Sequence, residues 1–161
     1  MTAGLAPIAE ALADTLKQRS QSVAVAESSA GGLISAALLA VPGASAYFLG
    51  GSVVYTGKAR MALLGLRRDD VAGVRSASEP YALILARTIR ENLGATWGLS
   101  ETGAAGPTGN GYGDAAGHTC VAVVGPKGKV ARTLRTGSND RVANMRAFAA
   151  EALKLMDEQL S

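Results

Sequence analysis

The stretch that decides the fold is residues 22–41, SVAVAESSAGGLISAALLAV. Its first part, residues 22–28, is short, alternating and rich in valine, a pattern that predicts a β-strand. Its second part, residues 29–41, has apolar residues at helical spacing and is followed by Pro42 and Gly43, which predicts a helix that ends there. A strand therefore turns directly into a helix near Ser28.

The same two patterns alternate along the rest of the chain. We predict further helices over residues 5–18, 58–65 and 80–94 (with Ser78 as N-cap) and from about residue 139 onward, and further strands over residues 50–56, 95–101, 118–125 and 129–136. Because helices separate the first three strands, these strands should run parallel. A loop without a helix precedes residues 118–125 and a tight turn follows them, so this fourth strand should be antiparallel. The predicted fold is an α/β/α sandwich with a mixed, mostly parallel five-stranded sheet, in one domain over residues 1–161.

Composition limits the classes of function. The chain is 48% hydrophobic and 18% charged, as folded domains are. Its net charge of +3 is scattered, which argues against direct nucleic-acid binding and agrees with a phosphate-bearing small-molecule partner. One cysteine (Cys120) and one histidine (His118) give neither an internal disulfide nor a metal site. Without a signal peptide or a membrane-length apolar run, we expect a cytoplasmic protein with no membrane partner.

The predicted topology collects the chemically interesting residues at one edge of the sheet. Ser28, Tyr55 and Thr102 follow the first three strands, His118 begins the fourth, and residues 137–141 follow the fifth. Ligands of open α/β sheets bind at the carboxyl ends of the strands. We therefore expect the functional site at this edge.

The turn at Ser28 has two interpretations. A serine at the end of a strand can present its hydroxyl outward as a nucleophile, and the amides near Gly31 and Gly32 can stabilise an oxyanion. Alternatively, Ser28 or Ser29 simply caps the helix that follows.

Two further segments are candidates for ligand binding. The glycine-rich loop from Thr102 through Gly103, Ala105, Gly106 and Gly109 can cradle a phosphate or a ribose with its backbone amides, or can be a plain surface connection. Arg141, just after Asp140 at the start of the last helix, suits a phosphate, but an ordinary ion pair at a solvated helix start explains it equally well.

A serine nucleophile needs a general base, and the sequence offers two. His118 is the usual kind of base, although a lone histidine at a strand start is often structural. Lys58, just past the second strand, would instead form a Ser-Lys arrangement.

The segment AESSAGGLISAALLAVPGASAYFLGGSVVYTGKARMALLGL, residues 26–66, closely resembles the CinA (competence/damage-inducible) C-terminal domain, also known as nicotinamide-nucleotide amidase. TGAAGPTGN (102–110) and GSNDR (137–141) resemble its other two signatures. The resemblance covers nearly the whole chain. It implies an α/β/α fold and a cytoplasmic amidohydrolase that converts nicotinamide mononucleotide to nicotinic acid mononucleotide and ammonia, without metal or organic cofactor. Some members carry an additional N-terminal molybdopterin-binding-like domain, which we do not expect here.

The family's motifs map onto this sequence with changes. In the motif Ala-Glu-Ser-Cys-Thr-Gly-Gly the serine is the nucleophile and falls on Ser28, whereas Ser29 and Ala30 replace the cysteine and threonine. Glu101 and Ala104 also depart from the residues usual around the glycine-rich loop, so we expect an altered pocket.

The main departure concerns the base. In the family's Tyr-Ser-Asn-x-x-Lys motif, Tyr55 matches the tyrosine, which would assist proton handling, and Thr56 matches the serine. Gly57 replaces the asparagine, and Arg60 stands in the place of the catalytic lysine. Arginine stays protonated and cannot take the proton of a serine. Lys58 or His118 would then have to act as the base.

Three functions follow as hypotheses. The first is amidase activity on nicotinamide mononucleotide or a related nucleotide. The second is nucleotide binding without hydrolysis, because of Arg60. The third, weaker one is an interaction protein in competence or DNA damage. A homo-oligomer packed through the alanine-rich helix at residues 33–40 and a monomer with that helix in the core are both compatible with the sequence.

Overall fold

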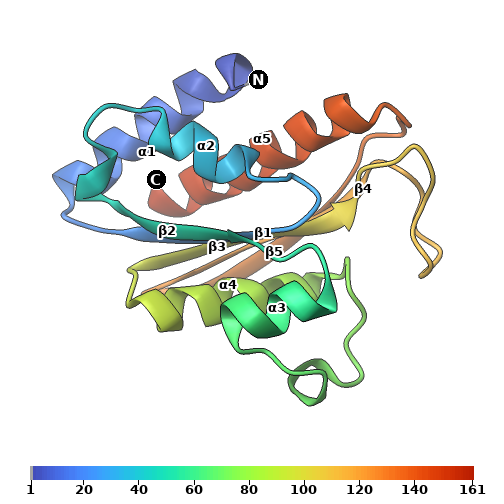
Figure 1. The fold of residues 1–161 in the computed structure, drawn as a ribbon. Coiled ribbons are helices and arrows are strands. Elements are labelled where there is room, and N and C mark those ends of the chain that lie inside the picture. Colours follow the sequence, from blue (N-terminus) through green and yellow to red (C-terminus); the bar gives the residue numbers. More distant parts are fainter. Residues whose placement is uncertain (1) are drawn as a thin grey trace.

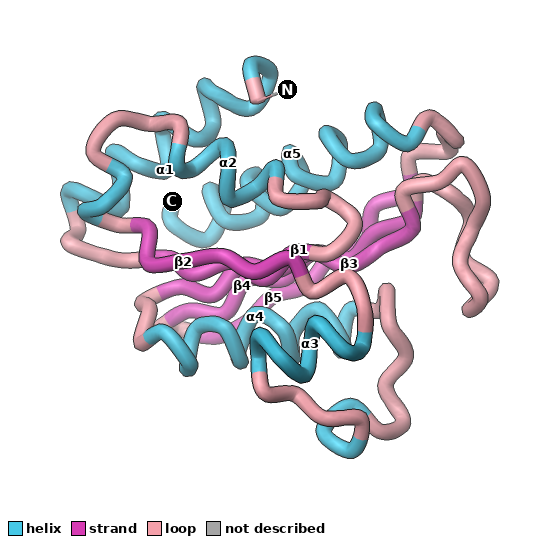
Figure 2. The backbone as a smooth tube through the Cα atoms, viewed as in Figure 1, coloured by secondary structure: helices cyan, strands magenta, loops and turns pink. Residues whose placement is uncertain are grey.

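The computed structural model describes residues 2–161 and contains one mixed sheet of five strands (Figures 1 and 2). The strands are β1 (Val23–Glu27), β2 (Phe48–Val53), β3 (Trp97–Ala104), β4 (His118–Gly125) and β5 (Gly128–Arg135). Their order in the sheet is β2-β1-β3-β4-β5. β1 pairs in parallel with β2 and β3, and β4 pairs antiparallel with both of its neighbours. The predicted sheet with its antiparallel fourth strand is confirmed.

Helices cover both faces of this sheet, as predicted. Figure 1 shows α1 (Ala6–Gln18), α2 (Leu33–Leu39) and α5 (Arg141–Leu160) on one face, and α3 (Gly57–Leu64) and α4 (Glu79–Leu93) on the other. The sequence did not predict three short 3₁₀ segments, Ala3–Leu5, Ala44–Ala46 and Asp69–Val71. No helix within residues 2–161 is long and apolar enough to cross a membrane.

Two buried layers hold the sandwich together. On the face of α1, α2 and α5, fully buried side chains such as Leu12, Leu38 and Phe148 pack against the sheet. On the other face, α4 approaches β3 so closely that a Cβ atom at Gly98 would lie 2.0 Å from the carbonyl oxygen of Ala86. A glycine is therefore required there for the helix to pack on the sheet.

Several element boundaries differ from the sequence prediction, among them those of β3, which was predicted over residues 95–101, and two of the differences have identifiable reasons. α2 begins at Leu33 rather than residue 29, because Gly31 and Gly32 adopt left-handed backbone conformations with φ of 68° and 98°. β2 ends at Val53 rather than residue 56, because Thr56 serves as N-cap of α3 and accepts a hydrogen bond from the amide of Ala59 at 3.0 Å. Ser78 caps α4 as predicted.

The connections that follow β1, β2, β3 and β5 all lie at one end of the sheet, on the right-hand side of Figure 1. The predicted functional edge therefore exists as a structural feature, and the site is built from these connections.

Candidate functional site

Ser28 lies directly after β1, in the turn that leads to α2. Its side chain is half-buried, and its hydroxyl has no hydrogen-bond partner within residues 2–161. It lines a cavity of about 330 Å³. The other residues around this cavity come from the β2–α3 connection and α3, from the segment before α4 and the first turn of α4, and from the end of β3 and the β3–β4 loop. They are Val54, Tyr55, Thr56, Gly57, Arg60, Ser76, Ala77, Tyr81, Thr102, Gly103, Asn110 and Tyr112.

The residue before Ser28 fixes the start of α2. Glu27 is fully buried, and its carboxylate accepts hydrogen bonds from the amides of Gly32 (2.8 Å), Ile34 (3.2 Å) and Ser35 (2.9 Å), and from the Ser35 hydroxyl (2.8 Å). These are donors that the first turn of a helix cannot satisfy within the helix itself. Glu27 therefore acts as a capping residue placed outside the helix that it caps.

A second buried carboxylate holds the turn from the neighbouring strand, β3. Glu101 on β3 accepts hydrogen bonds from the amides of Ser28 (3.0 Å) and Ala30 (2.8 Å) through Oε2. Its Oε1 accepts hydrogen bonds from the hydroxyls of Ser29 and Thr119. Burial raises the pKa of Glu101, although these hydrogen bonds favour its charged form and oppose the shift.

These contacts correct the expectation of an oxyanion site near Gly31 and Gly32. The Gly31 amide donates to the Ser28 carbonyl at 3.0 Å, and the Gly32 amide donates to Glu27. Neither glycine lines the cavity around Ser28. Among the amides from Ser28 to Gly32, only that of Ser29 has no acceptor within the described residues, and Ser29 lines the cavity that adjoins the Ser28 cavity.

Arg60 faces the same cavity as Ser28 and is its only charged lining residue among those described. Its guanidinium donates to the Leu66 carbonyl at 3.4 Å and to the Tyr81 hydroxyl at 3.2 Å, and it lies 6.0 Å from the centre of the Tyr81 ring. Arg60, which stands where the resemblance implies a lysine, thus places a fixed positive charge on the wall of the cavity that Ser28 lines.

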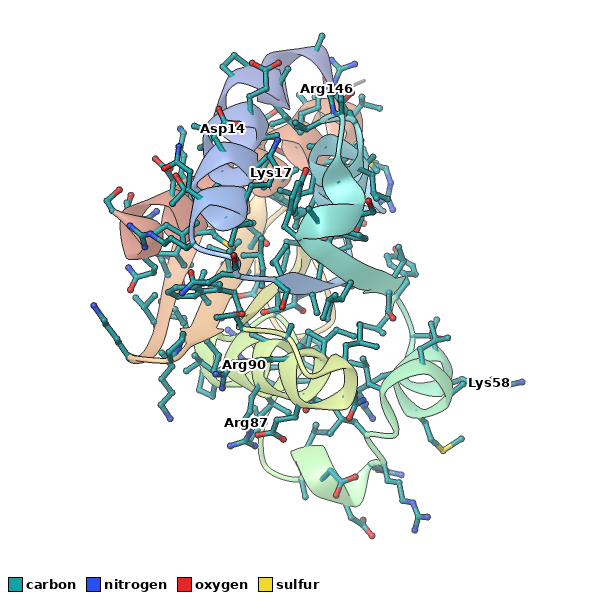
Figure 3. All side chains as sticks on the ribbon, turned by 90° about the vertical axis from the view of Figure 1, so that its left-hand side faces the viewer. Asp14, Lys17, Lys58, Arg87, Arg90 and Arg146 are labelled. Carbon is teal, nitrogen blue, oxygen red and sulfur yellow. The ribbon has the colours of Figure 1, made fainter. Side chains whose placement is uncertain are left out.

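The two residues predicted as bases do not lie in this cavity. Lys58 is exposed on α3 and points into open solvent, as Figure 3 shows. It cannot share the orientation of Arg60, because residues two apart on a helix face different directions. His118 is buried, its Nε2 lies 2.8 Å from the Ala77 carbonyl oxygen, and it lines a separate cavity with Asp114 and Arg135. The topology brings His118 to the correct edge but not to Ser28.

Arg141 and the glycine-rich loop form a second cavity of about 240 Å³. Arg141 donates to the Gly106 carbonyl and, at 3.3 Å, to the Tyr55 hydroxyl. The lining consists of Ser29, Tyr55, Gly103, Ala104, Ala105, Gly106, Thr108, Gly109, Asn110 and Arg141. The two cavities share Tyr55, Gly103 and Asn110, so they adjoin. Most of the residues predicted to bind a ligand therefore do come together.

The far end of the glycine-rich loop is tied to the start of α4. Asp114 accepts hydrogen bonds from Arg75 at 2.6 and 3.2 Å and from the Asn110 side chain at 2.9 Å. Burial disfavours the charged form of Asp114, but the hydrogen bonds from Arg75 and Asn110 outweigh this effect and lower its pKa. This pairing holds Asn110, which lines both cavities, in place.

Sequence reasoning missed the roles of Glu27 and Glu101. A signal for them exists, because each carboxylate stands in a strand of otherwise small or apolar residues, beside a turn rich in free amides. A charged residue in such a strand is rarely buried unless it is paired or hydrogen-bonded. Tyr81 was also missed, since its contact with Arg60 spans 21 residues of sequence.

The sequence matches known proteins over nearly its whole length. The model of the CinA C-terminal domain family matches residues 5–160. A CinA-like protein of Prochlorococcus marinus (strain MIT 9313) is 39% identical over 130 residues, which cover 81% of this chain and 30% of that protein. A CinA-like protein of Myxococcus xanthus (strain DK1622) is 39% identical over 150 residues, which cover 91% of this chain and 35% of that protein. The chain thus spans about a third of the length of these relatives.

Solved structures share the fold. The competence or damage-inducible protein from Enterobacter asburiae has a TM-score of 0.90 at 28% identity, with 98% of each chain covered. The competence/damage inducible protein CihA from Agrobacterium tumefaciens has a TM-score of 0.88 at 27% identity, with 97% of this chain and 94% of that chain covered. With the family model, the sequence relatives and these structures in agreement, the chain belongs to the CinA C-terminal domain family.

Proposed function

We propose that this protein hydrolyses the carboxamide of nicotinamide mononucleotide, or of a closely related nucleotide, with Ser28 as the nucleophile. The observation that carries the proposal is the Ser28 hydroxyl, which makes no hydrogen bond in the described chain and faces a cavity at the carboxyl end of the sheet. Small-molecule sites of α/β sheets lie at this edge. Family membership supports the proposal and does not by itself establish the reaction.

The proposed reaction divides between the two cavities. Ser28 attacks the carboxamide carbon, the C–N bond breaks, ammonia leaves, and water then releases the acid from the serine. The free amide of Ser29 donates to the oxyanion, as the amide after the nucleophile does in other serine hydrolases. Arg60 and Arg141 attract the phosphate, because a guanidinium binds phosphate oxygens with paired donors. Tyr55, which lies between the cavities, contacts the substrate and assists proton transfer.

The site lacks an evident base, and this favours a second candidate function. None of the described residues around the Ser28 cavity is a lysine, histidine or carboxylate. Arg60 stays protonated and cannot accept the proton of Ser28. A protein that binds the nucleotide without hydrolysing it would need only the arginines and the glycine-rich loop.

Ammonia release from nicotinamide mononucleotide separates these two functions. Ammonia from the wild type, with none from Ser28→Ala and nucleotide affinity changed by only a few fold (~3-fold, about 0.7 kcal/mol), supports the hydrolase. Nucleotide binding without ammonia in the wild type, and ammonia from Arg60→Lys, supports the binding protein. Lys58→Ala is the matched control, because this lysine is exposed and should change neither result. Absence of both binding and ammonia would reject both functions for this nucleotide.

A further inference from the structure

We propose that Glu101 is the positioning residue of the site, because its carboxylate fixes the turn that presents Ser28 to the cavity. The expected effect on turnover rests on the proposed function of Ser28. The expected effect on the backbone of the turn rests on its geometry alone. Glu101 itself lines neither of the two cavities, so it acts through Ser28 and its neighbours.

The geometry at Oε2 is that of a small anion-binding nest. The amides of Ser28 and Ala30, two residues apart, converge on this one oxygen at 3.0 and 2.8 Å. Backbone amides converge in this way only when the chain is bent around the anion. The carboxylate of Glu101 therefore defines the backbone conformation on both sides of Ser29.

The turn is fixed at its other end as well. Glu27 holds the amides of Gly32 and Ile34, so the chain from Ser28 to Ile34 lies between two buried carboxylates. Val54 donates to the Glu27 carbonyl at 2.8 Å and ties the end of β1 to the chain after β2. Ser28 is thus left with little freedom except in its side chain. A nucleophile held in this way loses little entropy when it meets a substrate.

The other carboxylate oxygen joins the turn to β3 and β4. Oε1 accepts from Ser29 Oγ and, at 2.9 Å, from Thr119 Oγ1, which also lies 3.1 Å from the Thr102 carbonyl oxygen. Glu101 forms no salt bridge within residues 2–161. All four groups that donate to Glu101 are neutral, so none of them compensates its negative charge. Their contacts with the carboxylate fix the conformation of the turn.

The nature of the four donors predicts which substitutions keep this geometry. The two amides at Oε2 can only donate, whereas the two hydroxyls at Oε1 can rotate and accept. In Glu101→Gln, the side-chain oxygen can still accept from the two amides, and the NH₂ group can donate to the two hydroxyls, which then act as acceptors. The contacts that hold the backbone of the turn are thus kept without the charge. In Glu101→Asp, the charge is kept but the carboxylate is one methylene too short to hold the turn.

The experiment compares these two variants in the full chain, with Ser100→Ala as the control. Ser100 is the neighbouring buried residue on β3, and its hydroxyl donates to the Ala82 carbonyl on the opposite face, away from the turn. We measure kcat and KM for ammonia release from nicotinamide mononucleotide, together with hydrogen exchange of the Ser28 and Ala30 amides. We expect Glu101→Asp to lower kcat about 100-fold with KM changed only a few fold, and to lose protection of both amides. Glu101→Gln and Ser100→Ala should keep kcat within about threefold and keep that protection.

Several results would overturn the proposal. Normal kcat and protected amides in Glu101→Asp would show that the turn does not need this carboxylate. Loss of kcat in Glu101→Gln would show that the charge of Glu101 matters rather than the geometry of its contacts. If Glu101→Asp does not fold, the kcat of Glu101→Gln alone still tests the proposal. If the wild type releases no ammonia, the proposed function fails, but amide protection kept in Glu101→Gln and lost in Glu101→Asp still supports the positioning role. Equal protection in both variants rejects it.

Discussion

Replacing Glu27 with glutamine should destabilise this protein much more than the same replacement at Glu101, although both carboxylates are buried and each accepts four hydrogen bonds. At Glu27, one oxygen faces the amides of Gly32 and Ile34, and the other faces the amide and hydroxyl of Ser35. A glutamine NH₂ group would therefore meet a backbone N–H on either side. At Glu101 it can face two hydroxyls instead.

The magnitude follows from the contacts that are lost. In Glu27→Gln, at least one hydrogen bond from a backbone amide to a carboxylate disappears, at a cost of about 1.5–3 kcal/mol. The amide left without an acceptor at the start of α2 costs about 1–3 kcal/mol more. The sum is about 2.5–6 kcal/mol in the free energy of unfolding, or roughly 10 °C in Tm for a chain of this size. Glu101→Gln leaves every backbone amide with an acceptor and removes only the acceptor of the Ser29 hydroxyl, because the Thr119 hydroxyl can donate to the Thr102 carbonyl instead. It should therefore cost less, about 1 kcal/mol.

Urea unfolding followed by circular dichroism at pH 7 measures both values. The comparison is internal, because each variant makes the same chemical change in a buried residue of the same sheet. Equal losses in the two variants would refute the reasoning that the type of donor decides the cost. A larger loss in Glu101→Gln than in Glu27→Gln would refute it more strongly, since it would mean that the charge of Glu101 is needed for folding.

Three further predictions concern pH and packing. Burial raises the pKa of Glu101 above its ordinary value of 4.5, so the folded chain binds this proton more tightly than the unfolded chain, and stability should fall as the pH rises from 4.5 through the raised pKa. The stability of Glu101→Gln relative to wild type should therefore increase over that range in urea unfolding, and a difference independent of pH would contradict the shift. Arg75→Ala should raise the pKa of Asp114, so that the stability due to its ionisation is lost at a higher pH as acid is added. A carboxyl NMR titration measures this change, and an unchanged midpoint would mean that Arg75 does not set that pKa. Gly98→Ala should destabilise the fold by about 3 kcal/mol or more in the same unfolding assay, because its Cβ atom would meet the backbone of α4. A loss below about 1 kcal/mol would show that the helix can shift.

The sequence predicts the fold well because its patterns are local. The alternation in residues 22–28 and the helical spacing that follows are properties of neighbouring residues, and the strand order follows from the connections between them. Boundaries are less predictable where a distant residue intervenes. α2 begins four residues later than predicted because the preceding amides bind Glu27 and Glu101 rather than helix carbonyls.

The site is only partly predictable for the same reason. Topology correctly brings Ser28, Tyr55 and Thr102 to one edge, because the ends of strands are set by the fold. Whether a side chain there reaches a particular cavity depends on its rotation about a helix or strand. In sequence, Lys58 lies between Gly57 and Arg60, two residues that line the Ser28 cavity, yet it faces solvent. His118 is near the edge yet buried against Ala77.

The residues that line the cavities differ from those that build the turn at Ser28, and this limits what an arginine at position 60 affects. The charged groups that line the two cavities, Arg60 and Arg141, are both permanent cations, so attraction for a phosphate does not depend on a titrating residue. The position of Ser28, the proposed nucleophile, depends in contrast on a turn held by Glu27 and Glu101, neither of which lines these cavities. Arg60 thus supplies a positive charge to the cavity but no proton acceptor, and its hydrogen bonds go to Leu66 and Tyr81 rather than to the turn that carries Ser28. If Arg60→Lys alone produces turnover, the rest of the catalytic geometry was already in place.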